Sequence, residues 1–142
     1  MPLHPLQAKP DHAEAAFGFL RSQGFEQTER WVTGGESFRD GWRLTYESPN
    51  IRLTVEYLDA QFDVRFSRAG LDVSYFLLDR VLFNRRSGFH GNMFAPEKLA
   101  NAIDRVAVDV RDHYGLTLKG DSETWRELDR ARQQSAPGRS LP

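Results

Sequence analysis

The chain has 142 residues, a formal net charge of −1 and no cysteine. This length fits one domain that buries its own core without disulfides or metals. The absence of cysteine excludes disulfide frameworks and thiolate-based zinc, iron–sulfur or nucleophile chemistry. A dedicated nucleic-acid-binding protein usually shows a basic excess. We therefore expect a single domain with no nucleic-acid partner.

The two ends of the chain are expected to lie outside this domain. Residues 1–10 contain three prolines and no periodic pattern, which predicts a flexible arm. The small, polar or proline residues at 135–142 predict a disordered tail. The first ten residues lack the apolar core of a secretory signal, and no apolar stretch approaches the roughly 18 residues of a membrane span. We expect a cytoplasmic protein without membrane association, whose domain spans residues 11–134.

The first predicted helix begins at Asp11, whose carboxylate can accept from free backbone N–H groups, with Glu14 at the spacing of a capping box. An apolar stripe at helical spacing follows, formed by Ala13, Ala16, Phe17 and Leu20. Gly24 stands where a left-handed residue would end this helix.

The middle of the chain alternates apolar and polar residues with a period of two, which predicts half-buried strands. The predicted strands are 25–32, 42–46, 51–57 and 62–66. If Tyr46 faces Ile51 and Val55 faces Val64, all apolar rows lie on the same face of a sheet. The pattern therefore predicts a meander with one apolar face.

The remainder of the chain is predicted to be mostly helical. The segment 75–83 favours a short helix, with a fifth strand as the alternative. Pro96 suits the first turn of a long helix with a clear apolar stripe that ends at Gly115. Asp121 can cap a last helix over 123–134. In the sequence, helices precede and follow the strand meander. This order predicts an α+β fold: an antiparallel sheet of about four strands with helices packed on one face.

The polar face of this sheet is the first candidate for a binding surface that contacts a protein partner. Its predicted contact residues are Arg43, Arg52, Glu56, Asp63 and Arg65. In the predicted register Glu56 lies opposite Asp63, a like-charge pair that costs stability unless a neighbouring arginine relieves it. The simpler interpretation is an ordinary solvated sheet face with cross-strand charge pairs.

The segment 85–94 is the second candidate surface. It contains two arginines, a histidine and two glycines, which can cradle a phosphate or carboxylate, and aromatic residues that can grip a partner. Its predicted contact residues are Arg85, Arg86, His90 and Phe94. The simpler interpretation is a loop whose aromatic residues close one end of the core. It contains neither GxxxxGK[ST] nor GxGxxG, so no motif supports nucleotide binding.

Catalytic and metal-binding residues are not predicted. Asp109 and His113 share one face of the long helix, but two ligands do not make a metal site, and helix capping explains the histidine. The sheet acids lack the cleft and the defined separation that acid–base catalysis needs. We expect no cofactor and no enzymatic activity.

The order of these features resembles the small bacterial α+β domains of the polymorphic-toxin immunity protein type. The resemblance spans residues 13–128 and lies in the helix that ends at Gly24-Phe25, the strands 42–46 and 51–57, the helix 99–114, and Gly120-Asp121 before Trp125. It implies a protein that binds and blocks a partner toxin. Contact surfaces differ among such proteins, so the resemblance assigns no residue.

Three functions follow from these observations. The first is a non-enzymatic protein-binding module, with an immunity protein as its concrete form. The second is a small-molecule-binding domain or minor enzyme with a pocket near the 85–94 segment. The third is a structural homo-oligomer that pairs through the edge strand 25–32. We expect the first; the sequence leaves the partner and the oligomeric state open.

Overall fold

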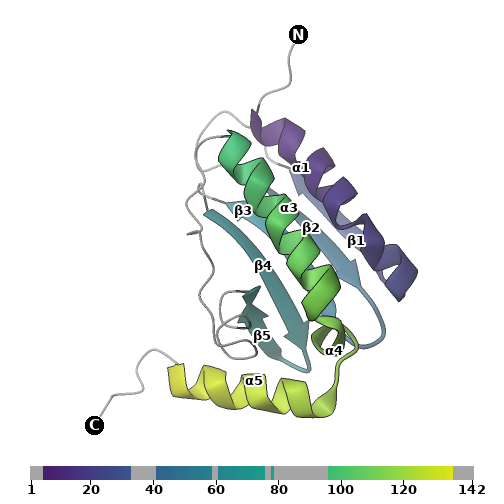
Figure 1. Cartoon of the computed structure of the whole chain (residues 1–142), viewed down its shortest axis with the longest axis vertical. Coiled ribbons are helices and arrows are strands. Elements are labelled where there is room, and N and C mark those ends of the chain that lie inside the picture. The colour runs from purple at the N-terminus through teal and green to yellow at the C-terminus, as the bar shows by residue number, and fades with distance from the viewer. Residues whose placement is uncertain (1–4, 33–40, 59–60, 76–77, 79–95, 136–142) are drawn as a thin grey trace.

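A computed structural model describes residues 5–32, 41–58, 61–75, 78 and 96–135 of the chain (Figure 1). One antiparallel sheet runs in the order β1 (Glu26–Val32), β2 (Trp42–Glu47), β3 (Arg52–Leu58), β4 (Gln61–Arg68) and β5 (Leu71–Ser74). The helices are α1 (Pro5–Ala16), the 3-10 helix η1 (Gly18–Gln23), α3 (Pro96–His113), α4 (Gly115–Leu118) and α5 (Ser122–Ser135). In Figure 1, α1 and α3 lie side by side over one face of the sheet, and α5 lies across its lower end.

The α+β class and the antiparallel meander are confirmed, but the sheet has five strands rather than about four. The additional strand, β5, is four residues long and pairs with β4. It follows a two-residue turn in which Ala69 and Gly70 have φ of 51° and 84°. Two positive φ values are typical of the tight turn whose twist matches a hairpin. So short a strand offers too few alternating positions for periodicity to reveal it.

The α3 and α5 helices confirm the predictions for the C-terminal part of the chain, and the short α4 helix between them was not predicted. The α3 helix begins at Pro96 and ends before Gly115, and α5 begins just after its predicted cap. Asp121 Oδ2 accepts from the backbone N–H of Thr124 at 3.0 Å and from its hydroxyl at 2.8 Å. Within the segment 75–83, the structure describes Tyr75 and Leu78 as helical and buried. The other residues of that segment lie outside the described part of the chain.

The first helix begins earlier than predicted. It starts at Pro5 rather than Asp11, so the predicted flexible arm of residues 1–10 is helical from Pro5 onward. Pro10 lies inside the helix and is buried. The helix packs along α3, where His12 Nε2 lies 2.8 Å from Asp104 Oδ1. Tertiary packing outweighs the cost of an internal proline, because most helix stability in proteins comes from such packing.

The pairing of β2 with β3 differs from the predicted register by two residues. Tyr46 pairs with Leu53 rather than with Ile51. The connection closes as Ser48 N–H donates to the Ile51 carbonyl at 3.0 Å, and Ser48 Oγ accepts from Ile51 N–H at 3.2 Å. Because the shift is even, the apolar side chains stay on the face towards the helices. The predicted register between β3 and β4 is confirmed.

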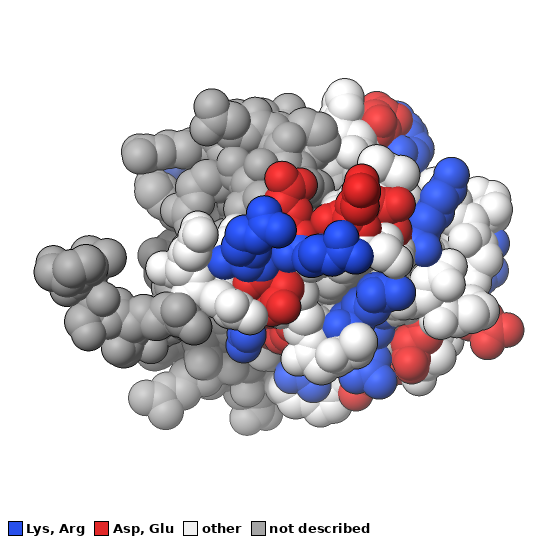
Figure 2. Space-filling model, turned by 90° about the horizontal axis from the view of Figure 1, so that it is seen from below, with Lys and Arg blue, Asp and Glu red and all other residues white. Residues whose placement is uncertain are grey.

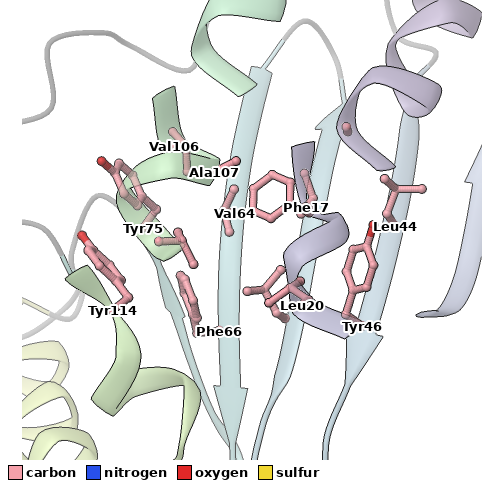
Figure 3. Close-up of a cluster of buried hydrophobic side chains, with 14 of the residues drawn as sticks. Phe17, Leu20, Leu44, Tyr46, Val64, Phe66, Tyr75, Val106, Ala107 and Tyr114 are labelled. Atoms are coloured by element: carbon pink, nitrogen blue, oxygen red, sulfur yellow. The ribbon is translucent and has the colours of Figure 1, made fainter. Parts of the chain in front are cut away.

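The core lies between this apolar face and the helices (Figure 3). Phe17 and Leu20 from the predicted helical stripe are fully buried against the sheet. On the other side of the core, Tyr114 stacks on Tyr75 and on Phe66, with ring centroids 5.7 and 6.0 Å apart. The helices therefore cover one face of the sheet and leave the polar side chains on the other.

Candidate functional site

The sheet face that points away from α1 and α3 is the candidate binding surface. We call it the outer sheet face. Its charged residues are Glu26, Glu29, Arg43, Glu47, Arg52, Glu56, Asp63, Arg65 and Asp72. The surface is hollowed by an open depression of about 490 Å³ over β1 to β5. The residues that line this depression all belong to strands, and none belongs to a helix that the structure describes.

The structure places all the predicted sheet residues on this one surface. Arg43, Arg52, Glu56, Asp63 and Arg65 project from β2, β3 and β4 at outward-facing register positions. The residues of the second predicted surface, Arg85, Arg86, His90 and Phe94, lie outside the described residues. The outer sheet face is therefore the surface that can be analysed in atomic detail.

A network of ion pairs occupies one half of the outer sheet face. The Arg65 guanidinium lies 3.1 Å from Asp63 Oδ2 and 2.8 Å from Asp72 Oδ2. Ser67 Oγ donates to the other oxygen of Asp72 at 3.0 Å. Burial opposes the charge of Arg65, but the hydrogen bonds and charges of Asp72 and Asp63 raise its pKa overall. Arg65 is thus engaged by two carboxylates and has little capacity left for a third.

Carboxylates outnumber arginines on the outer sheet face, six to three by the residues that define it. Two pairs of carboxylates face each other directly across strands: Glu26 opposite Glu47, and Glu56 opposite Asp63. Burial raises the pKa of Asp63 to about 6; Glu56 adds to this effect and Arg65 opposes it. Opposed like charges destabilise a sheet. The surface is therefore acidic and incompletely neutralised by its own arginines.

Trp31 on β1 is a surface residue of the outer sheet face. The residue is 41% exposed, and the Arg43 guanidinium lies 5.4 Å from the centroid of the Trp31 ring. This geometry is a cation–π contact. A bulge between Gln27 and Glu29 shifts the alternation of β1, which turns Glu29 and Trp31 outward. Because the bulge breaks the period-two alternation within β1, a regular alternating pattern does not identify these residues.

The described residues do not gather three or more metal-ligating side chains in one place. Asp109, considered with His113 as a metal ligand, accepts a hydrogen bond from the Tyr75 hydroxyl at 2.6 Å. Within the same described ranges, none of the helices combines the length and apolarity that crossing a membrane requires.

Comparison with known proteins finds no matching family model, no matching curated sequence and no matching solved structure. Function is therefore inferred from the geometry and charge of the outer sheet face. The acidic surplus, the exposed Trp31 and the openness of the depression are the features that bear on it.

Proposed function

We propose that the protein is a non-enzymatic binding module whose outer sheet face contacts a partner protein with a basic surface. The observation that carries this proposal is the surplus of carboxylates, including the opposed pair Glu56 and Asp63. A basic side chain placed between two carboxylates converts their repulsion into attraction. Complementary charge of this kind speeds association and selects the partner.

The exposed Trp31 supports the same proposal. Tryptophan and arginine are enriched among the residues that dominate binding energy at protein interfaces. Here the Trp31 ring and the Arg43 guanidinium already contact each other at the margin of the depression. A partner would bury this pair while its basic residues contact the carboxylates beside it. The depression reaches across all five strands, and this breadth suits the surface of a partner protein.

The concrete form that we propose is a bacterial immunity protein that binds and blocks a toxin. This form rests on the resemblance in the order of helices and strands, and the acidic outer sheet face is its proposed toxin-binding surface. In this interpretation, basic residues of the toxin contact Glu29 and Glu56. The toxin itself is identified only by that chemistry.

The homo-oligomer is the less favoured alternative. Its proposed edge, β1, carries a bulge between Gln27 and Glu29 and the charged residues Glu26 and Arg30. Bulges and charges are the devices that protect sheet edges from pairing with other chains. The pocket alternative concerns the segment 85–94, which lies outside the described residues.

The first experiment is native mass spectrometry of the tagged protein, purified gently from its own host. We expect one stoichiometric protein partner. Its association rate is then measured with Glu56→Gln and with the control Glu127→Gln. Glu127 is an exposed carboxylate on α5, away from the outer sheet face, so both variants remove the same charge.

The proposal predicts opposite effects of Glu56→Gln on stability and binding. Removing one of two opposed carboxylates raises the free energy of unfolding by up to about 1 kcal/mol. The same change slows association about fivefold at low salt, because it removes an attraction of about 1 kcal/mol with a basic partner. Glu127→Gln changes neither quantity. A stability gain with unchanged association would identify an ordinary solvated sheet face and contradict the proposal.

A further inference from the structure

A second hollow lies at the end of the molecule that carries α5, between that helix and the turn joining β4 to β5. Its volume is about 500 Å³, and it shares no lining residue with the outer sheet face depression. Three arginines line it: Arg68 from β4, and Arg126 and Arg132 from α5. We call this site the arginine hollow. Figure 2 views the molecule from this end, where basic and acidic side chains lie close together.

The arginines of this hollow are not neutralised by the described carboxylates, in contrast to Arg30 and Arg65. Arg30 and Arg65 each pair with two carboxylates. By contrast, Arg68, Arg126 and Arg132 form no ion pair with any carboxylate of the described ranges. The one acid in the lining, Asp129, accepts a hydrogen bond from Gln133 at 3.3 Å. Three arginines and one aspartate give the lining a formal charge of +2.

The Arg68 side chain is partly buried. A Cβ atom added at Gly120 would lie 3.1 Å from Arg68 Nε, so this side chain packs closely over the connection between α4 and α5. Gly120 has φ of 73°, a conformation that favours glycine. A guanidinium that is already positioned loses less side-chain freedom when it binds an anion.

The turn at the rim of the arginine hollow is strained. Ala69 has φ of 51°, and among the described residues it is the one non-glycine residue with positive φ. This conformation costs an alanine about 1 kcal/mol. The hairpin between β4 and β5 enforces this conformation, because a two-residue turn of this kind requires positive φ.

We propose that the arginine hollow binds a phosphate monoester. The planar guanidinium fork matches the oxygens of a phosphate, and a monoester carries a charge of about −2 at neutral pH, which balances the lining. The hollow is larger than a phosphate group and falls within the usual range of small-molecule sites, roughly 300 to 1,000 Å³. Leu71 and Trp125 also line it, and they offer an apolar wall for the organic part of the ligand.

The test is a titration of the ¹⁵N-labelled full chain with phenyl phosphate at constant ionic strength, followed by NMR. We expect saturable shifts at the amides of residues 68–71 and at the Trp125 indole. Arg126→Gln and Arg132→Gln each weaken affinity about tenfold, because each loses a charge-assisted hydrogen bond. Both arginines are exposed, so neither variant threatens folding. Arg130→Gln, on the same exposed helix but outside the lining, leaves affinity unchanged.

Three results would overturn the proposal. The first is the absence of saturable shifts. The second is equal weakening by Arg126→Gln and Arg130→Gln, which would indicate attraction to overall charge rather than to a site. The third is equal affinity for inorganic phosphate and phenyl phosphate, because the apolar wall would then contribute nothing. The proposal is independent of the partner protein: Glu56→Gln leaves this titration unchanged.

Discussion

Glu56 on β3 and Asp63 on β4 lie directly opposite each other on the outer sheet face. Arg65, 3.1 Å from Asp63, only partly compensates for the repulsion, because it also pairs with Asp72. Burial and the charge of Glu56 together bring the pKa of Asp63 to about 6. At neutral pH the sheet therefore holds two opposed negative charges that a proton or a cationic partner would relieve.

This arrangement predicts that Asp63 destabilises the fold as pH rises. The pKa of Asp63 is about 6 in the folded protein against 3.8 for an ordinary aspartate, so the folded state binds the proton more tightly. The resulting stabilisation is fully present below pH 3.8 and is lost as pH rises through 6. The total change is about 2–3 kcal/mol at most.

Asp63→Asn tests this prediction. The amide oxygen can still accept from Val64 N–H, which lies 2.8 Å from Asp63 Oδ1, but the side chain no longer ionises. We expect the variant to gain stability over the wild-type protein between pH 4 and 7, in urea denaturation at several pH values. Parallel stability curves for the two proteins across that range would show that Asp63 does not titrate as stated.

Removing the hydroxyl group from each of two buried tyrosines is predicted to change the free energy of unfolding differently. Tyr46 Oη has no hydrogen-bond partner among the described residues, and burial, with the charge of Glu14, raises the pKa of Tyr46 to about 12. Tyr75 Oη donates to Asp109 at 2.6 Å. Tyr75→Phe should lower the free energy of unfolding by about 1.5–3 kcal/mol, while Tyr46→Phe leaves it unchanged or raises it by about 1 kcal/mol. Chemical denaturation measures the free energy of unfolding of both variants. Equal losses of stability would contradict the prediction.

The turn between β4 and β5 predicts a stabilising substitution. Ala69→Asn should raise the free energy of unfolding by about 1 kcal/mol, because asparagine tolerates the left-handed conformation and Asn-Gly suits this turn. Gly70→Ala is the matched control: a Cβ there meets nothing within 4 Å, so only the φ of 84° opposes it. It should cost about 1 kcal/mol. Thermal unfolding distinguishes the two, and destabilisation by Ala69→Asn would contradict the assigned turn.

Gly41 is predicted to be required by close backbone packing. A Cβ atom at this position would overlap the Tyr57 carbonyl oxygen on β3, which is paired backbone and cannot move aside freely. Gly41→Ala should therefore cost about 3 kcal/mol. Gly18→Ala is the control, because a Cβ there meets nothing within 4 Å. If Gly41→Ala unfolds at the same denaturant concentration as Gly18→Ala, the close approach is absent in solution.

The sequence alone predicted the elements whose signals are local. Period-two alternation located β2, β3 and β4, and 3.6-residue periodicity located α3 and α5 with the Asp121 cap. These patterns also placed Arg43, Glu56 and Asp63 on the polar face, because the alternation of a regular strand decides which way each side chain points. An error of two residues in the pairing of β2 with β3 left this placement intact.

Tertiary structure decided the features that depend on contacts distant in sequence. Packing along α3 extends α1 back to Pro5, and pairing with β4 makes a strand of four residues after the Ala69 turn. The bulge in β1 turns Trp31 outward onto the outer sheet face. The arginine hollow joins a β4 residue to α5 side chains more than fifty positions later. Periodicity reports only which residues share a face; it carries no information on which faces and ends meet, because packing between elements decides that.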